Sequence, residues 1–316
     1  MKNSRRNFIR KVSIGGAAMF AIAPLLGQKR PEQQKAKNPA PIVPFKLKYA
    51  PSIGMFRQNA GEDPIDNIKF CHDQGFRAMF DNGFMRRTPE VQEKIMSELK
   101  NLGMDFGPYV LMADSGKQDF VLNTQEVKDM LTAKMKEAVE LAKRTGARMA
   151  LVVPGRYDLK LHPDYQMANV IDNLRRCCDI VEPEGITIVL EPLNPYINHP
   201  GLFLKGIPQA YAICRAVNRP SCKILNDLYH QQITEGNLIP NIDAAWSEIA
   251  VFHLGDTPGR NEPTTGEINY KNIFRHLYNK KYDGVLCMEH GASQRGTKEG
   301  EMRVIQAYRE CDNFEV

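Results

Sequence analysis

The sequence of 316 residues predicts an α/β fold, a single-domain (β/α)8 TIM barrel. From residue 46 onward, short apolar runs alternate with longer segments of helical period, as expected of repeated β-α units. Eight such units fit, at about 33 residues each, close to the ~30 residues of a β-α-β crossover. A doubly wound open sheet is the alternative, but neither G-x-G-x-x-G nor G-x-x-x-x-G-K-[ST] occurs at a strand-to-helix turn to support it. The eight repeats therefore favour closure into a barrel.

The expected strands are the eight apolar runs, which cover residues 47–55, 77–81, 105–111, 148–153, 187–193, 223–228, 250–254 and 284–289. The clearest helix spans residues 124–145, where Thr124 is the expected N-cap and Gly146 ends the helix. Two further helices are expected at residues 163–181 and 297–311. These elements place the barrel over residues 46–316.

The charge distribution argues against a nucleic-acid partner. The chain has 42 Lys and Arg residues against 37 Asp and Glu residues, a formal net charge of +5. Residues 1–48 hold 11 of the basic residues and one acid, so the remaining 268 residues carry a net charge of −5. Binding along a phosphate backbone depends on clustered cations, which this weakly acidic body lacks. A small-molecule substrate is therefore expected.

The N-terminus has the features of an export signal. Arg5 and Arg6 precede an apolar, uncharged run at residues 12–26 that is too short for a stable membrane span. Residues 1–30 are therefore expected to be a twin-arginine signal segment, with the export machinery as partner and the periplasm as location. An ordinary basic amphipathic helix is the alternative.

Two details of this region affect what happens after export. The A-x-A site at residues 21–23 is followed by Pro24, a poor context for cleavage, and an uncleaved signal would tether the protein to the membrane. Residues 31–45 are rich in Pro, Gln, Lys and Ala and are expected to form a disordered linker.

The cysteines do not form a recognisable disulfide framework. They are odd in number, lack a C-x-x-C pair and mostly lie in apolar runs, which favours buried free thiols. They are Cys71, Cys177, Cys178, Cys214, Cys222, Cys287 and Cys311.

Metal-ligating side chains stand at the ends of the last four expected strands. In a barrel of this class the carboxyl ends of the strands converge on one mouth, where catalysis takes place. Four consecutive strands end in Glu191, Asp227, His253 and Glu289. Three adjacent carboxylates need a compensating cation, and this ligand set suits one divalent ion, Mn²⁺ or Mg²⁺, with Co²⁺ or Zn²⁺ as alternatives. A single carboxylate just after a strand is more often a helix cap or a solvated loop residue than a metal ligand. The prediction therefore depends on all four residues together.

The same region carries a family resemblance. It lies in the segments LEPLN at 190–194 with PGLFL at 200–204, NDLYHQQ at 226–232, DTPGRNEP at 256–263 with TGEINY at 265–270, and YDG at 282–284 leading to Glu289. These segments resemble hydroxypyruvate isomerase, within the wider xylose isomerase-like TIM barrels of sugar phosphate isomerase/epimerase type. The similarity is densest over residues 186–290.

The resemblance implies a metal-dependent aldose-ketose isomerase that converts hydroxypyruvate to tartronate semialdehyde. Glu191 and Glu289 would then be metal ligands and also the acid/base pair, and Asp227 and His253 would complete the metal shell. Such a role is also chemically reasonable for these residues, because carboxylates beside the two reacting carbons can move a proton between them through an enediolate. The free imidazole nitrogen of His253 is expected to find a hydrogen-bond partner. A homo-oligomer is left open.

Two departures keep other functions open. The isomerases of the family usually have Gln where His253 stands, whereas the related ketose 3-epimerases have His, and the isomerases are usually cytoplasmic. The first alternative is therefore a periplasmic ketose 3-epimerase, or a related isomerase or epimerase of larger or keto-modified sugars. The second is a non-catalytic sugar-binding barrel, against which the presence of both Glu191 and Glu289 argues.

Four further residues are candidates for binding the substrate, a sugar or a hydroxy-keto acid. Arg260 follows the seventh strand and could hold a substrate carboxylate with two parallel hydrogen bonds. His230 lies three residues after Asp227, and Asn194 and His199 lie in the loop after Glu191. A structural role is the alternative for each, because polar loop residues are commonly solvated or cap a helix.

Overall fold

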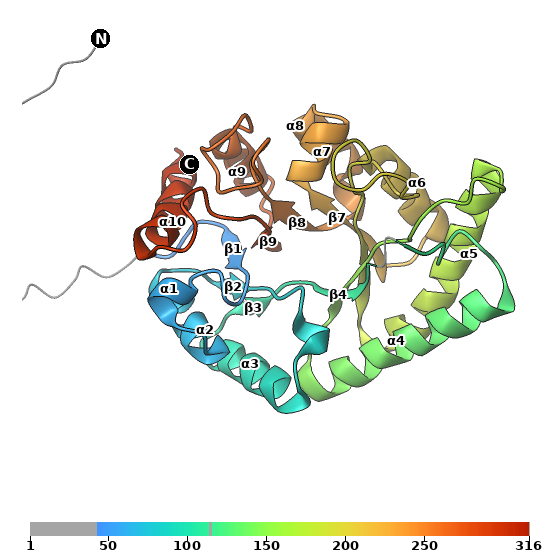
Figure 1. Ribbon diagram of the computed structural model, residues 1–316, viewed down its shortest axis with the longest axis horizontal. Coiled ribbons are helices and arrows are strands. Elements are labelled where there is room, and N and C mark those ends of the chain that lie inside the picture. The colour runs from blue at the N-terminus through green and yellow to red at the C-terminus, as the bar shows by residue number, and fades with distance from the viewer. Residues whose placement is uncertain (1–42, 114–115, 316) are drawn as a thin grey trace, which may run out of the picture. The chain divides into compact units, whose positions relative to one another are not determined.

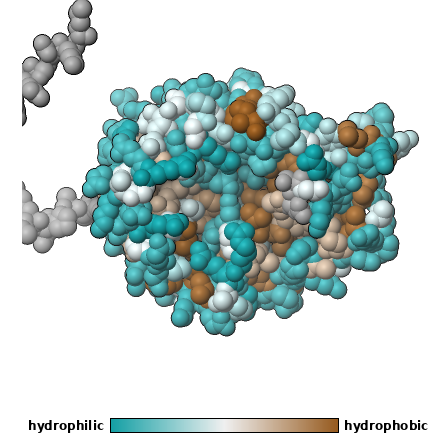
Figure 2. Space-filling model, viewed as in Figure 1, coloured by the Kyte–Doolittle hydropathy of each residue, from teal (hydrophilic) through white to brown (hydrophobic). Residues whose placement is uncertain are grey.

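The computed structural model describes residues 43–113 and 116–315. Over these residues the chain forms a strongly curled parallel sheet with helices around it, which confirms the TIM barrel and excludes the open doubly wound sheet (Figure 1). On the face seen in Figure 2, hydrophilic residues form most of the outline and apolar residues gather around a central hollow.

All eight expected strands are present, the third of them in two parts. The strands are β1 (Lys48–Pro51), β2 (Ala78–Met79), β3 (Asp105–Phe106), β4 (Tyr109–Met112), β5 (Met149–Val152), β6 (Thr187–Leu190), β7 (Cys222–Asp227), β8 (Ile249–Leu254) and β9 (Val285–Met288). Strands β4 to β9 pair in chain order, and β9 pairs with β1. A bridge between Ser52 and Phe80 joins β1 to β2, and β2 pairs with β3, which completes the circuit.

The third strand is divided at Gly107. A Cβ atom at this position would lie 3.0 Å from both the Phe80 Cβ and the Cys287 Sγ, so the side chains that fill the barrel leave no room for another one here. Pro108 follows and has no N–H to donate to a ladder. The two parts therefore pair with different neighbours, β3 with β2 and β4 with β5.

The three expected helices are confirmed. The Thr124 hydroxyl accepts a hydrogen bond from the Val127 N–H, and Gly146 ends the helix in the left-handed conformation. The helices are α1 (Arg57–Ala60), α2 (Pro64–Asp73), α3 (Pro89–Asn101), α4 (Gln125–Thr145), α5 (Pro163–Val181), α6 (Ile207–Val217), α7 (Leu228–Thr234), α8 (Leu238–Ala245), α9 (Tyr270–Asn279) and α10 (Lys298–Asp312), with short 3-10 turns at 84–86, 182–184 and 246–248.

The strand residues divide between two apolar cores. Successive side chains of a strand point to opposite faces, so alternate residues enter the barrel or pack against the helices. In β9, for example, Val285 and Cys287 belong to a small inner cluster, whereas Leu286 and Met288 belong to the large outer one. The inner cluster also includes Leu151, Val189, Leu225 and Val251, one from each of four other strands. The interior of the barrel is therefore filled beneath its mouth.

The cysteine prediction is also confirmed. All seven cysteines are buried and free. Cys287 lies inside the barrel, and the others belong to the outer core.

The expected signal at residues 1–30 lies outside the described residues. Of the expected linker at residues 31–45, only residues 43–45 are described. Phe45 at the end of this linker is buried and packs its ring against Tyr49 and Phe76, so the packed body begins there. Within the described ranges, no helix is both long and apolar enough to cross a membrane.

Candidate metal centre

The four predicted ligand residues converge at the mouth of the barrel. One potential ligand atom from each of Glu191, Asp227, His253 and Glu289 lies within 4.8 Å of those from the other three. Glu191, Asp227 and His253 are at most 5% exposed, and the Glu289 side chain is 24% exposed. Three of the four side chains are thus shielded from solvent, and Glu289 is the most accessible of the four.

Strand register explains this convergence. Glu191 directly follows β6, Asp227 ends β7, His253 lies in β8 and Glu289 directly follows β9. Asp227 pairs with His253 across β7 and β8, and His253 pairs with Cys287 across β8 and β9. Each of the four residues stands two positions after an apolar residue of the inner cluster, so each shares its inward direction.

His253 lies between the two glutamates. Its Nδ1 is 3.1 Å from Glu191 Oε1 and 3.0 Å from Glu289 Oε2. Burial raises the pKa of Glu191 to about 7, and the charge of Glu289 adds to the increase. Burial opposes ionisation of Glu289 as well, but His253 and Arg260 hold its pKa below the ordinary value. Burial also opposes the charged form of His253, yet the surrounding carboxylates raise its pKa well above the ordinary value.

Arg260 supplies a second positive charge. Its Nη2 donates to Asp227 Oδ2 at 2.9 Å and also to Glu289 Oε2, while its Nε donates to the Glu289 carbonyl oxygen at 3.2 Å. The other Asp227 oxygen caps helix α7 by accepting from the N–H groups of Tyr229 and His230. Arg260 is thus bound to the acidic centre, where the sequence predicted a contact with the substrate.

The loop that carries Arg260 is fixed from within. The Asp256 carboxylate accepts hydrogen bonds from the N–H groups of Thr257, Gly266 and Ile268. A Cβ at Gly266 would lie 1.8 Å from the Thr257 carbonyl oxygen, so this position admits only glycine without rearrangement. The T-G-E segment noted in the sequence therefore has a packing reason, because it holds the turn in which Arg260 stands.

The donor set fits a divalent cation. Three carboxylates and one imidazole within 4.8 Å of one another have the composition and spacing of a site for a hard or borderline metal ion. Two carboxylates and the imidazole are buried, and burying such charges without a counter-ion is costly. One expectation is wrong: His253 Nε2 has no hydrogen-bond partner within the described ranges, and the Cys287 thiol and the Phe80 ring lie beside the imidazole.

A cavity of about 230 Å³ adjoins the centre. Its polar wall contains Glu191, Glu289, His199, His230 and Arg260, and its apolar wall contains Val110, Ala113, Leu151, Val153, Leu193 and Leu202. Its size suits a small molecule with a polar and an apolar face.

Three of the four predicted substrate-binding residues, His199, His230 and Arg260, line this cavity. Burial lowers the pKa of His230 to about 4, which keeps its imidazole neutral, and Arg260 Nη1 lies 3.2 Å from its Nε2. Asn194 is fully buried behind His230, and its side-chain nitrogen lies 2.7 Å from His230 Nδ1. Asn194 therefore orients His230 and does not itself line the cavity.

Asn82 is a site residue that the sequence analysis missed. It follows the short strand β2, and its Nδ2 donates a hydrogen bond to Glu289 Oε1, while its Oδ1 is buried without a partner within the described ranges. Asn82 thus fixes the carboxylate of Glu289 opposite His253. Its neighbour Asp81 is the last residue of the expected second strand, but no motif marked Asn82 itself.

The comparisons with known proteins agree with this fold. A sequence model of the family described as Xylose isomerase-like TIM barrel matches residues 68–309. The chain is 32% identical over 186 residues to a putative hydroxypyruvate isomerase of Xenopus laevis, which covers 57% of this chain and 67% of that protein. It is 30% identical over 172 residues to hydroxypyruvate isomerase of Escherichia coli K12, which covers 54% and 66%. It is also 33% identical over 153 residues to a 2-oxo-tetronate isomerase of Pectobacterium atrosepticum, which covers 48% and 58%.

Solved structures share the fold. An AP endonuclease of family 2 from Brucella melitensis has a TM-score of 0.70 at 23% identity, over 83% of this chain and 99% of that chain. A 3-keto-D-glucoside 4-epimerase from E. coli has a TM-score of 0.67 at 18% identity, over 84% of this chain and all of that one. At these identities the structures support the barrel alone.

We expect the affinity of this centre for Mn²⁺ to fall as the pH is lowered from 8 to 6. The raised pKa values of Glu191 and His253 mean that both groups hold protons near neutral pH, and a cation must displace those protons. Raising the pH removes the competing protons and strengthens binding. Calorimetric titration of metal-free protein at several pH values measures the effect, and an affinity independent of pH would contradict it.

We expect Asn82→Ala to lower the Mn²⁺ affinity about tenfold, as is typical when a residue that orients a metal ligand is removed. The reason is that the Glu289 carboxylate loses the amide that fixes one of its oxygens. Asn169→Ala on helix α5 is the matched control, because the Asn169 amide donates to the Val121 carbonyl oxygen, away from the metal centre. Equal metal affinity in both variants would remove Asn82 from the site.

Proposed function

This chain belongs to the xylose isomerase-like TIM barrel family, and from that premise we propose that it is a metal-dependent isomerase of hydroxypyruvate type. The proposed reaction interconverts hydroxypyruvate and tartronate semialdehyde. It rests chiefly on one observation, the two glutamates on either side of His253 at the mouth of the barrel. The similarity to hydroxypyruvate and 2-oxo-tetronate isomerases, at about 30% identity, supports the same class of reaction.

The arrangement suits proton transfer between adjacent carbons. One glutamate takes a proton from the hydroxymethyl carbon, the electron pair forms the enediolate, and a proton returns to the former carbonyl carbon. The hydroxyl proton passes from the hydroxymethyl oxygen to the former carbonyl oxygen, which leaves an aldehyde and a new hydroxyl group. A divalent ion held by Glu191, Asp227, His253 and Glu289, Mn²⁺ or Mg²⁺ in the first instance, would stabilise negative charge on the two substrate oxygens.

The remaining residues position the substrate and the carboxylates. Asn82 and Arg260 fix the Glu289 side chain, and the neutral His230, held between Asn194 and Arg260, forms part of the cavity wall. The apolar residues of the cavity lining, among them Leu151 and Leu193, limit the access of water to the reacting carbons.

A second candidate is a ketose 3-epimerase, or a related isomerase or epimerase of a larger or keto-modified sugar. The observation that favours it is the imidazole of His253 in the ligand cluster, the residue that the sequence analysis associates with the epimerases. Both reactions begin with removal of a proton from a carbon beside a carbonyl group. An epimerase returns the proton to the opposite face of the same carbon, whereas an isomerase returns it to the former carbonyl carbon.

We expect the Mn²⁺-loaded protein to convert hydroxypyruvate. The substitution Glu289→Gln should reduce turnover by about a hundredfold or more, since a carboxylate that transfers a proton contributes on that scale. The exposed Glu126→Gln on helix α4 should leave turnover unchanged. Exchange of solvent deuterium into a ketose at C3, with hydroxypyruvate left intact, would decide for the epimerase. Sugar binding with no turnover in the unaltered protein would decide for a non-catalytic barrel.

We also propose that residues 1–30 direct export by the twin-arginine route to the periplasm, on the basis of Arg5, Arg6 and the apolar run that follows. Replacing both arginines with lysine should leave the protein in the cytoplasm, because the paired arginines are the feature that the export machinery reads. Cell fractionation measures this, with Lys2→Arg as the control. Unchanged export of the double-lysine variant would contradict the proposal.

A further inference from the structure

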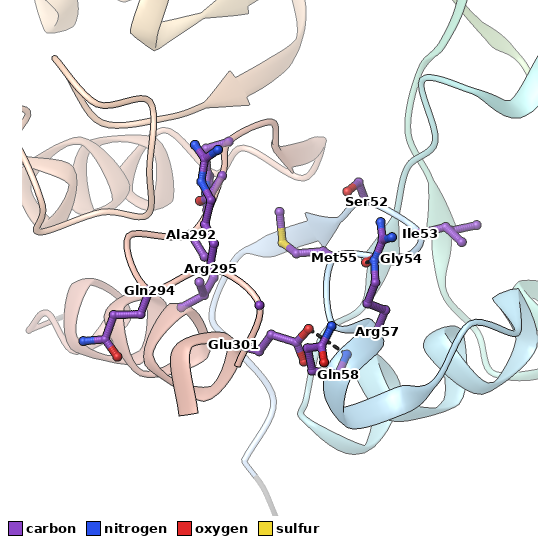
Figure 3. Close-up of a pocket in the computed structure, with 14 residues that line it drawn as sticks. Ser52, Ile53, Gly54, Met55, Arg57, Gln58, Ala292, Gln294, Arg295 and Glu301 are labelled. Carbon is purple, nitrogen blue, oxygen red and sulfur yellow. Dashed lines mark hydrogen bonds between the residues drawn. The ribbon is translucent and has the colours of Figure 1, made fainter. Parts of the chain in front are cut away.

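A second cavity at the mouth of the barrel lies beside the metal centre and plays no part in the chemistry proposed above. Its volume is about 480 Å³, larger than that of the cavity at the centre. It lies between the loop after β1 and the loop after β9 (Figure 3). We call it the arginine pocket, and it is lined by residues 52–55, 57, 58, 290–292, 294–296, 301 and 304.

Two guanidinium groups of the arginine pocket lack acidic partners. Arg57 and Arg295 rise from opposite sides of the pocket, and in Figure 3 their guanidinium groups point to the same side. Arg57 uses only its Nε, which donates to the Gly54 carbonyl oxygen at 3.2 Å. Other arginines of the barrel pair with carboxylates, for example Arg219 with Asp179 and Glu182. Within the described ranges, neither Arg57 nor Arg295 contacts a carboxylate.

The one acidic residue of the pocket is already satisfied. The carboxylate of Glu301 is only 6% exposed and accepts hydrogen bonds from the backbone N–H groups of Gln58 and Asn59 at 2.8 and 2.9 Å. It also accepts from the side chain of Asn59 at 2.7 Å. Glu301 therefore ties helix α10 to helix α1 beneath the pocket, and the accessible charge of the pocket is positive.

The backbone of the loop after β9 leaves room for the Arg295 side chain. A Cβ atom at Gly291 would lie 2.9 Å from the Arg295 Nη2, so a glycine at this position lets the guanidinium group lie against the loop. The Gly291 N–H donates to the Arg260 carbonyl oxygen at 2.9 Å. Arg260 and Glu289 line the cavity of the metal centre, whereas His290 and Gly291 line the arginine pocket. The two cavities thus adjoin at the segment after β9, where Glu289 faces one and the next two residues line the other.

We infer that the arginine pocket binds the oxyanion end, a phosphate or a carboxylate, of a sugar substrate whose reacting carbons lie at the metal centre. Guanidinium groups bind both anions through paired, charge-assisted hydrogen bonds. This assignment rests on the proposed function for the reacting end of the substrate. The substrate would then be a molecule longer than hydroxypyruvate, either a sugar phosphate or a sugar acid.

The test compares the binding of charged and neutral sugars to the full-length, Mn²⁺-loaded protein by calorimetry. D-ribulose 5-phosphate is compared with D-ribulose, and D-galacturonate with D-galactose, so that the two pairs separate phosphate from carboxylate recognition. We expect at least one anionic sugar to bind about tenfold or more tightly than its neutral partner, in keeping with a charge-assisted contact.

Variants assign this preference to the two arginines. The double variant Arg57→Met and Arg295→Met should lose the preference for the anion and keep its Mn²⁺ affinity, whereas replacement of both by lysine should keep much of it. Arg176→Met on helix α5 is the control for loss of an exposed arginine outside the pocket. Equal binding of charged and neutral sugars, or a preference that survives in the methionine variant, would overturn the inference. Binding is measured without turnover, so a failure of the proposed isomerase activity gives a separate result.

Discussion

The centre depends on the alternation of side chains in a closed parallel sheet. Glu191, Asp227, His253 and Glu289 each stand two residues after an apolar side chain of the inner cluster, so the direction that fills the barrel lower down also brings the polar groups together. The pairing of Asp227 with His253 sets their height along the barrel axis. A shift of one residue in any of these strands would turn its ligand toward the helices and leave a charge in the outer core.

Convergence of these charges creates an electrostatic problem that the neighbouring residues partly solve. Three carboxylates share a volume with little access to water, and the protein opposes them with the His253 ring and the Arg260 guanidinium group. The two positive groups act unequally on the glutamates, because Glu289 contacts both and Glu191 contacts only His253. The pKa of Glu289 is accordingly lowered, whereas burial dominates at Glu191 and raises its pKa. Chemically identical side chains thus acquire different proton affinities from their surroundings.

The sequence predicted those parts of the site that follow from strand periodicity. The four ligand positions could be found because each ends an apolar run, and Thr124 and Gly146 marked the ends of their helix because capping is local. Asn82 could not be found in this way, since its role comes from contact with Glu289, 207 positions away in the chain. The partners of Arg260 were missed for the same reason: a loop motif identifies a turn, but not the carboxylates that the side chain reaches.

Arg260 brings a positive charge into contact with the carboxylates at the barrel mouth. Its Nη2 shares the oxygens of Asp227 and Glu289 with any cation that these residues bind, so guanidinium and cation compete for the same negative charge. The Arg260 Nε is bound separately, to the Glu289 carbonyl oxygen, and this contact does not depend on the carboxylates. A cation that took over the carboxylates would therefore leave Arg260 held by its Nε and by the contact of its Nη1 with His230, and would release only Nη2 on the wall of the cavity. An acidic centre that attracts a metal ion can in this way still present positive charge to an anionic substrate.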